Sequence, residues 1–309
     1  MNKKPRFIYF GTTNQLSLSA FDRLLAGGAA PLAVVVTTHA AGSPADMPLQ
    51  QLFPAASLSQ LPLQNRYHRP TLIQAAWSAG VPLFALADVA SVAIRDLITR
   101  LRTDFACFAC FPWRLPQDLI LSLPFGFLNV HPSLLPHYRG PAPLFWLFQR
   151  YDLAHRGITV HQMDAGLDTG PLVRQEPISF ADGLDQARIE HQCGQIGGRL
   201  LLEAMRLLSS GRPARPQTDR GSYFPWPTPA DYRLHSNWSA LHAYNFMRAT
   251  NSSRMAYPLT LAGQDLSLVE AVRVDPQGRQ DAPLLLNGPM AQIQFQTGIL
   301  TARLDLTPV

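Results

Sequence analysis

The sequence predicts an α/β fold in which a parallel sheet flanked by helices is followed by a smaller all-β domain. In the first part of the chain, short apolar runs alternate with stretches whose apolar residues recur at helical spacing, a pattern typical of parallel sheets covered by helices. After a proline-rich segment the pattern changes to short β-like runs separated by Gly and Pro. The chain has 309 residues, 47% of them hydrophobic, which is enough for two packed domains.

The first domain is expected over residues 1–208. Its strands are predicted from apolar runs at 6–10, 32–38, 81–86, 105–111, 127–131 and 157–163. Its helices are predicted after the first strand, through Phe21, Leu24 and Leu25, and then at 71–79, 91–102 and 184–209. The segment 40–66 is rich in Ala, Pro, Ser and Gln without a clear period, so it is expected to be a long irregular loop.

The turn after the first strand holds Gly11 but no G-x-G-x-x-G pattern. That pattern is the one that cradles the pyrophosphate of a dinucleotide. The first domain is therefore expected to be Rossmann-like without a dinucleotide site.

A linker and a second, smaller domain are expected after residue 208. Residues 209–236 form a proline-rich connector that cannot be regular helix. Residues 237–309 hold one predicted helix, near 238–250, and then short β-like runs. A small β-barrel is the expected architecture of this part.

Charge and cysteine content limit the class of protein. The formal net charge is +5 and the pI is about 9.4, a mild bias toward anionic partners. Three cysteines provide no disulfide framework, and the N-terminus leads directly into a strand-like run, so a cytoplasmic protein without a membrane segment is expected. Cys107 and Cys110 fall in an apolar run and are expected to be core thiols, and the scattered histidines predict no metal site.

The most informative residues follow the strand predicted at 127–131. Asn129 and His131 are two residues apart, so both side chains emerge on the same face of the sheet. A proline-rich loop comes next, at the strand end where open α/β sheets bind ligands. Further on, Asp168 lies between Gly166 and Gly170, in a turn whose backbone can approach a ligand closely.

These residue types suit acyl transfer to an amine. An oxyanion forms when an amine attacks a carbonyl, and the Asn129 amide or a protonated His131 can stabilise it. His131 and Asp168 form an acid/base pair able to take a proton from the amine and return it to the leaving group. No Ser or Cys occupies an obvious nucleophile position, since Ser133 is expected to cap the loop, so direct transfer is predicted.

Two motifs carry a resemblance to a known family. N-x-H-P-S-L-L-P-x-Y-R-G at 129–140 and Q-M-D-x-G-L-D-T-G at 162–170 resemble the signature of the folate-dependent formyltransferases, of which methionyl-tRNA formyltransferase is the best known. The resemblance extends over nearly the whole chain. It implies a Rossmann-like catalytic domain followed by a small, open, OB-like barrel.

The same resemblance implies site residues. Asn129, His131 and Asp168 would be catalytic, and the co-substrate would be 10-formyltetrahydrofolate, with no metal. The residues implied to bind the folate are Phe111, Trp113, Leu115, Gln162, Met163, Asp164 and Gly166. The residues implied to bind the acceptor are Ser133, Leu134, Leu135, Pro136, Tyr138, Arg139 and Gly140.

The acceptor stays open at this point. Methionyl-tRNA formyltransferases carry a basic insertion after the second strand, whereas residues 37–51 contain no Lys or Arg, and a loop that grips RNA needs cations. Transfer to an amino sugar linked to a nucleotide, or to another small amine, is the alternative. A formyltetrahydrofolate hydrolase is a third interpretation, weakened because the first strand begins at residue 6 and an extra preceding domain is not expected. A catalytically idle, RNA-binding relative is a fourth, weakened by the intact catalytic set.

Overall fold

The computed structural model describes residues 5–38, 47–54, 70–111, 113–218, 220–251 and 255–305. Its contacts divide the chain into two compact units. The first unit comprises Met1–Arg139, Gly157–Pro177 and Glu190–Gly221, and the second comprises Gly140–Arg156, Ile178–Ile189 and Ser222–Val309. The continuous domains expected at 1–208 and 237–309 stay a prediction.

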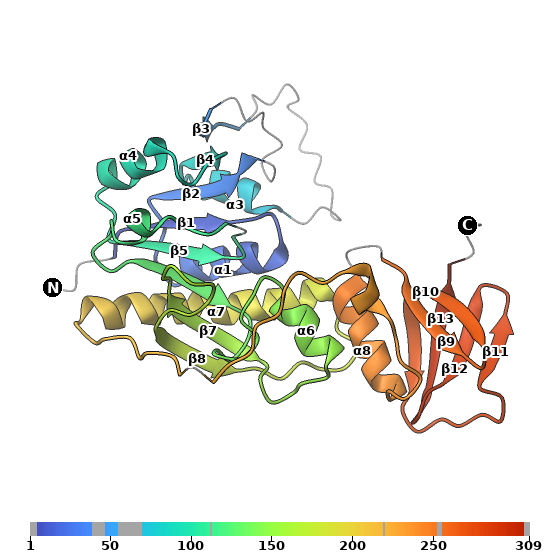
Figure 1. Ribbon diagram of the computed structural model, residues 1–309. Helices are drawn as coiled ribbons and strands as arrows, with labels where there is room; N and C mark the ends of the chain where they lie inside the picture. The colour runs from blue at the N-terminus through green and yellow to red at the C-terminus, as the bar shows by residue number, and fades with distance from the viewer. Residues whose placement is uncertain are drawn as a thin grey trace. The chain divides into compact units, whose positions relative to one another are not determined.

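The first unit contains an eight-stranded mixed sheet with the strand order β3-β4-β2-β1-β5-β6-β7-β8 (Figure 1). The bounds of these strands are β1 Phe7–Gly11, β2 Ala33–Thr37, β3 Leu49–Leu52, β4 Leu83–Leu86, β5 Phe105–Ala109, β6 Phe127–His131, β7 Gly157–Gln162 and β8 Leu172–Pro177. The five strands from β4 to β6 in this order run parallel to one another. The predicted Rossmann-like parallel sheet is therefore confirmed for its centre, while β3, β7 and β8 extend it in antiparallel fashion.

Helices lie on both faces of this sheet, as the alternating pattern predicts. In chain order the helices of the molecule are α1 Gln15–Ala26, α3 Leu72–Ser78, α4 Val92–Arg100, α5 Gln117–Ile120, α6 Pro143–Gln149, α7 Gln186–Ser209 and α8 Ala240–Thr250, with the 3-10 helix η1 at Pro229–Tyr232. Leu97 of α4 and Leu119 of α5 join Phe10 and Phe127 in one buried cluster. On the opposite face, Gly197 of α7 packs against Val130 of β6.

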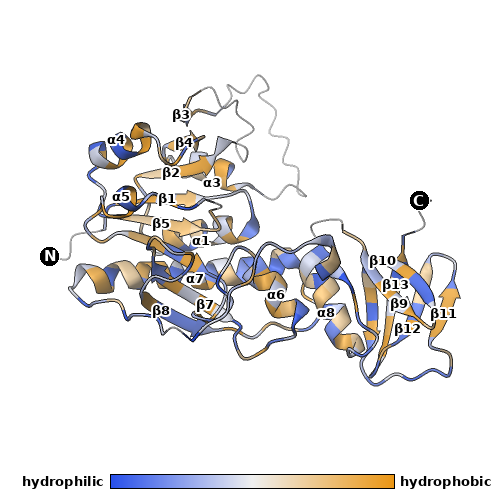
Figure 2. Ribbon diagram, in the orientation of Figure 1, coloured by the Kyte–Doolittle hydropathy of each residue, from blue (hydrophilic) through white to orange (hydrophobic). Residues whose placement is uncertain are grey.

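The apolar runs of the sequence form the buried centre of the sheet. Every residue of β1, β2, β4 and β5 is buried, as expected for parallel strands covered on both faces. Figure 2 shows these strands as mostly hydrophobic, whereas α7 carries both hydrophilic and hydrophobic residues. None of the helices within the described ranges is long and apolar enough to cross a bilayer.

Several elements differ from the sequence-based expectation, among them the short helix α5, which was not predicted. The segment 40–66 is not wholly irregular, because β3 forms within it and pairs with β4 through Leu49 and Leu86. The half-buried sequence LQQL of β3 is too short for an alternating pattern to be recognised. The rest of the segment, at 40–46 and 55–66, lies outside the described residues. The strand β8 and the helix α6 were also not predicted, since Pro143 at the start of α6 suggested a loop although proline is accepted in a first helical turn.

The second unit contains a five-stranded antiparallel sheet with the order β11-β12-β13-β10-β9. The bounds of its strands are β9 Tyr257–Leu261, β10 Gln264–Asp275, β11 Leu284–Asn287, β12 Met290–Gln294 and β13 Ile299–Leu304. The helix α8 packs on β10 and β13 and also contacts α6, and its Phe246 is fully buried. In the described part of the chain β9 and β11 do not pair with each other, so the predicted small β domain is present as an open sheet.

Candidate active site

The strands β6 and β7 bring four polar side chains to one face of the sheet. The two strands are antiparallel, with Asn129 opposite His161 and His131 opposite Thr159. Directly opposed residues of an antiparallel pair share a face. Asn129 and His131 also lie at the carboxyl end of β6, next to the parallel strand β5, where ligands of open α/β sheets bind.

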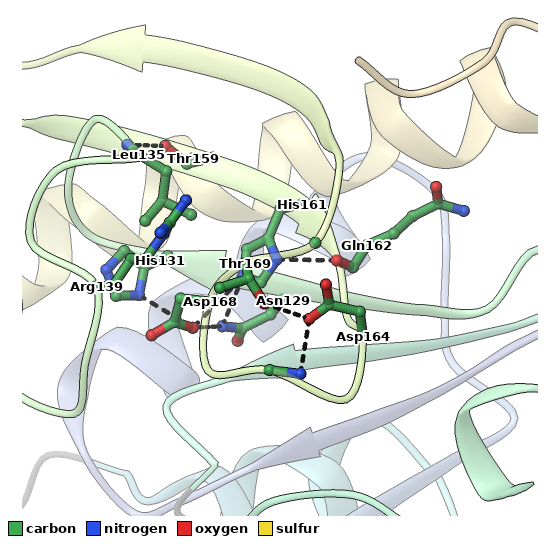
Figure 3. A network of polar contacts seen from close by, with 12 residues as sticks. Asn129, His131, Leu135, Arg139, Thr159, His161, Gln162, Asp164, Asp168 and Thr169 are labelled. Carbon is green, nitrogen blue, oxygen red and sulfur yellow. Dashed lines mark hydrogen bonds and ion pairs between the residues drawn. The ribbon is translucent and has the colours of Figure 1, made fainter. Parts of the chain in front are cut away.

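Asp168 reaches this group from the loop between β7 and β8 (Figure 3). Its Oδ1 lies 3.5 Å from Asn129 Nδ2, 3.6 Å from His131 Nδ1 and 3.5 Å from His161 Nε2. The side chains of His131, Asp168 and His161 are only 5%, 10% and 2% exposed. The structure thus brings together the three residues that the sequence singled out, and it adds a second histidine.

The loop that carries Asp168 is held in a tight conformation. Asp168 itself has a φ of 56°, in the left-handed region that non-glycine residues adopt at a cost. Asp164 Oδ1 accepts hydrogen bonds from Thr169 Oγ1, at 2.7 Å, and from the backbone nitrogen of Gly166, at 3.1 Å. A Cβ atom at Gly170 would overlap the carbonyl oxygen of Gln162, so this glycine allows the loop to approach the end of β7.

The hydrogen bonds of His131 determine which of its ring nitrogens faces Asp168. His131 Nε2 lies 2.8 Å from the carbonyl oxygen of Tyr138, and a carbonyl only accepts, so Nε2 carries a hydrogen. Burial lowers the pKa of His131, while the nearby Asp168 carboxylate opposes that shift. The neutral ring therefore presents the lone pair of Nδ1 to the side of Asp168, where a proton can be taken up.

His161 was missed by the sequence analysis, which treated it as one of several scattered histidines. Its Nδ1 lies 3.0 Å from the carbonyl oxygen of Gln162, which fixes a hydrogen there, and its Nε2 lies 3.3 Å from Asn129 Nδ2. The amide of Asn129 therefore donates to His161. The only available signal was the register of β6 against β7, which single-sequence patterns do not give.

The loop that follows His131 is tied to β7 and to itself. Thr159 Oγ1 donates to the carbonyl oxygen of Ser133, at 2.6 Å, and accepts from the backbone nitrogen of Leu135, at 3.1 Å. Ser133 Oγ donates to the carbonyl oxygen of His137, at 2.7 Å, in agreement with the loop-capping role expected for this hydroxyl. The loop thus has a fixed conformation beside the catalytic candidates.

The residues implied to bind the acceptor occupy different environments in this loop. Buried positions shape the loop, and half-buried positions are available to a ligand. The buried residues are Ser133, Leu135, Tyr138 and Gly140, and the half-buried residues are Leu134, Pro136 and Arg139. Gly140, with a φ of 116°, ends the loop in a conformation that favours glycine.

The residues implied to bind the folate gather at one edge of the core. Phe111, Trp113 and Met163 are partly buried and pack against the same apolar cluster, which Leu115 joins as a buried member. The rings of Phe111 and Trp113 meet edge to face at 5.3 Å. A half-buried aromatic wall of this kind fits a flat heterocycle such as a pterin.

Polar groups accompany this wall on the segment that follows β7. Gln162 Nε2 donates to the carbonyl oxygen of Phe125 at 3.1 Å, and the backbone nitrogen of Met163 donates to the carbonyl oxygen of Phe127 at 2.7 Å. In the Asp168 loop Gly166 is exposed, and Asp164 is half-buried. The segment 162–166 therefore runs beside the aromatic wall in a defined conformation.

The cysteines and histidines outside this group form no metal site among the residues that the structure describes. Cys107 is fully buried in β5, as expected for a core thiol. Cys110 follows the strand with a φ of 57° and is half-buried. Burial raises the pKa of both thiols, to about 12 for Cys110, so neither favours the thiolate form.

A comparison with known families identifies the class of this site. The sequence pattern of the formyl transferase family matches residues 9–205, a range that includes β6, the Asp168 loop and nearly all of α7. This chain belongs to the formyl transferase family. The resemblance carried by the two motifs at 129–140 and 162–170 is thereby confirmed, and both motifs lie inside the matched range.

Curated formyltransferases resemble this chain over about two thirds of its length. Methionyl-tRNA formyltransferase of Syntrophus aciditrophicus is 30% identical over 208 residues, which cover 67% of this chain and 66% of the relative. The methionyl-tRNA formyltransferase of Paracidovorax citrulli is 35% identical over 217 residues, which cover 69% of this chain and 62% of the relative. The matched part therefore spans slightly less than two thirds of each relative's length.

Solved formyltransferase structures share the fold over nearly the whole chain. WlaRD, a sugar 3N-formyl transferase, superimposes with a TM-score of 0.61 at 14% identity and full coverage of both chains. An N-formyltransferase from Helicobacter canadensis superimposes with a TM-score of 0.62 at 14% identity, covering 97% of this chain and 99% of the other. At this identity the likeness concerns the fold alone, and it includes the small C-terminal sheet.

Proposed function

We propose that this formyltransferase moves a formyl group from 10-formyltetrahydrofolate to a primary amine. The observation that carries the proposal is the convergence of Asn129 Nδ2, His131 Nδ1 and His161 Nε2 on the same oxygen of Asp168. This cluster combines an amide donor with groups that can hold a proton, inside a family whose members transfer formyl groups. Met163, which directly follows β7, packs against the same apolar cluster as the aromatic wall that we propose for the pterin.

The reaction sets a clear requirement for proton transfer. A bond forms between the amine nitrogen and the formyl carbon, and the bond from that carbon to the folate nitrogen breaks. The amine loses a proton, and the folate nitrogen gains one. His131 and Asp168 are placed to take and return this proton, because Nδ1 of His131 has its lone pair on the side of the carboxylate.

The negative charge that develops on the formyl oxygen needs a donor. One hydrogen of the Asn129 amide is directed at His161 Nε2, at 3.3 Å, whereas the contact to Asp168 is long, at 3.5 Å. The second hydrogen is therefore held only weakly and can turn to a substrate oxygen, since catalytic contacts tighten when substrate binds. Removing such a donor typically costs about 100- to 1000-fold in kcat.

The folate is proposed to bind with its pterin between the aromatic wall of Phe111 and Trp113 and the segment 162–166. The backbone of that segment is anchored by the hydrogen bond between Met163 and Phe127, so its remaining polar groups have fixed positions. The formyl group would then lie toward Asn129 and His131, which stand on the strand paired with β7. The co-substrate supplies the activated formyl carbon, and the protein supplies orientation and the proton path.

Methionyl-tRNA is the first acceptor to test, because the curated relatives at 30–35% identity are methionyl-tRNA formyltransferases. An amino sugar linked to a nucleotide is the second candidate. Two observations favour it: residues 37–51 carry no Lys or Arg, and structures that share the fold over the whole chain include a sugar N-formyl transferase. Both acceptors present a primary amine to the same proposed chemistry.

The test is formyl transfer from 10-formyltetrahydrofolate in three parallel reactions. One contains charged methionyl-tRNA, one contains a panel of nucleotide-linked amino sugars, and one contains no acceptor. Asp168→Asn serves as the inactive control, and Asp118→Asn, which alters a 70% exposed carboxylate paired with Arg95, serves as the matched active control. Product that depends on an acceptor and on Asp168 supports the proposal.

The outcome of each reaction supports a different conclusion. Product on tRNA that declines steeply with salt indicates binding through phosphates. Product only on an amino sugar makes the protein an enzyme that formylates a small molecule. Formate release that needs no acceptor makes the protein a formyltetrahydrofolate hydrolase, and the absence of folate turnover in all three reactions refutes the proposed function.

A further inference from the structure

We propose that Gln217 is a positioning residue that holds Asp168 in its working conformation and couples the Asp168 loop to Arg139. The proposal deepens the proposed function and rests on it. Gln217 lies in the connector that follows α7, outside the range matched by the family pattern. The residue does not touch the groups that exchange protons, so its role would be exerted through Asp168.

Both the nitrogen and the oxygen of the Gln217 side-chain amide form two hydrogen bonds. Its Nε2 donates to the carbonyl oxygen of Asp168, at 2.8 Å, and to the carbonyl oxygen of Gly170, at 2.7 Å. Its Oε1 accepts from Nη2 and Nε of Arg139, at 2.9 and 3.3 Å. One amide thus binds the backbone on both sides of Thr169 and the guanidinium at the end of the acceptor loop.

The connector places Gln217 firmly enough to act in this way. Two residues before it, Arg215 exchanges two backbone hydrogen bonds with Leu172, at 2.7 and 2.8 Å. Leu172 is the first residue of β8, at the other end of the Asp168 loop. The side chain of Gln217 therefore extends from a segment that is fixed to the same strand as the loop it holds.

The conformation of the Asp168 loop explains why such a restraint matters. A non-glycine residue adopts the left-handed region only at a cost in free energy, and Asp168 has a φ of 56°. The side-chain contacts of Asp168 with Asn129, His131 and His161 are long, at 3.5–3.6 Å, so each of them depends on where the loop places the carboxylate. The two short hydrogen bonds from Gln217 to the loop's carbonyl groups restrain the loop from outside, in addition to the internal hydrogen bonds of Asp164.

The contact with Arg139 adds a second consequence. Arg139 lies in the loop that follows His131, directly before Gly140, so the loops on the two sides of the cluster both bind the side-chain amide of Gln217. A displacement of Arg139 by an incoming acceptor would be transmitted to Asp168 through Gln217. The catalytic carboxylate and the proposed acceptor loop are expected to move together.

Two substitutions separate these roles. Gln217→Glu keeps an acceptor for Arg139 but removes both donors to the carbonyl oxygens, whereas Gln217→Ala removes every contact. Gln195→Ala is the matched control, because Gln195 Nε2 also donates to a backbone carbonyl, that of Ser19, at 3.2 Å, on the opposite face of the sheet. The measurements are kcat and KM for the acceptor, folate affinity, the pH profile of kcat, and hydrogen exchange of the segment 164–170.

We expect both Gln217 variants to lose about 10- to 100-fold in kcat, the cost of a misplaced catalytic group. The acid limb of the pH profile should move, because Asp168 no longer lies at its native distance from His131. Hydrogen exchange should rise in 164–170 and not in the Gln195 control. The acceptor KM should rise only in Gln217→Ala, in which Arg139 loses both of its hydrogen bonds to residue 217.

A kcat within about twofold of wild type in Gln217→Glu, or unchanged exchange at 164–170 in both variants, would overturn the proposal. Reduced kcat in Gln217→Ala alone would also overturn it, since the contact with Arg139 would then be the one that matters. If the wild-type protein transfers no formyl group, the proposed function fails independently. Hydrogen exchange then decides by itself whether Gln217 restrains the Asp168 loop.

Discussion

Asn129 and His161 face each other across β6 and β7, with Asn129 Nδ2 3.3 Å from His161 Nε2. Because His161 Nδ1 is directed at the carbonyl oxygen of Gln162, its Nε2 is free to accept. The histidine therefore fixes which way the Asn129 amide points. In this orientation the Nδ2 hydrogens of Asn129 face His161 Nε2 and Asp168 Oδ1.

Replacement of His161 tests this orientation. His161→Leu removes the acceptor, and we expect kcat to fall about 10- to 100-fold, corresponding to the 1–3 kcal/mol of an unpaired buried donor. His161→Gln offers an amide oxygen to Asn129 and should recover part of the activity. Equal kcat values in both variants would contradict an orienting role for His161.

Asp168→Asn should retain folate binding and lose formyl transfer by at least about 100-fold, the usual contribution of general acid/base catalysis. The amide keeps the size of the carboxyl group but cannot accept a proton. Folate affinity by fluorescence titration and single-turnover formyl transfer separate the two effects. Near-normal turnover would remove Asp168 from the mechanism.

The pH profile of kcat/KM reports the state of His131. Burial lowers the pKa of His131 from its ordinary value, so the proton-accepting neutral ring persists below about pH 6.5. We expect kcat/KM to fall on the acid side with a midpoint below 6.5. A midpoint above that value would mean that the attraction of Asp168 outweighs the burial of the ring.

The stability of the second unit should depend on pH through His242. Burial lowers the pKa of His242 to about 4, against the opposing effect of the carbonyl oxygens of Gln149 and Phe148, which accept from its Nε2 at 2.9 and 3.1 Å. Between about pH 6.5 and 4 the unfolded chain binds a proton that the folded chain does not. The stabilisation is therefore complete above pH 6.5 and is lost as the pH falls toward 4.

His242→Gln checks this expectation. The glutamine amide can still donate to a carbonyl oxygen, but it does not titrate. Thermal unfolding at pH 7 and pH 5 should show a smaller loss of Tm in the variant than in the wild-type protein. An identical loss in both proteins would assign the acid sensitivity to other groups.

The sequence predicts the part of this structure that depends on local pattern. The fully apolar runs FIYFG and FACFA become buried strands, and the two motifs locate Asn129, His131 and Asp168. Contacts between distant segments are not encoded in that way. His161 is 32 residues from Asn129, and Gln217 is 49 residues from Asp168, and neither lies at a spacing that a helix or strand would produce. The same reason explains β3, whose position depends on β4 more than on its own four residues.

The pairing of β6 with β7 also determines which sequence changes this protein can accept. Residues alternate between the two faces of a strand, and Val130 and Val160 occupy the positions next to the polar set on the opposite face. A one-residue shift in the pairing of β6 with β7 would exchange the faces of the polar residues and the valines, so that the histidines would face α7 and the valines would face Asp168. A change of length is therefore expected to be tolerated in the loops that flank β6 and β7 and not in the paired residues of these two strands.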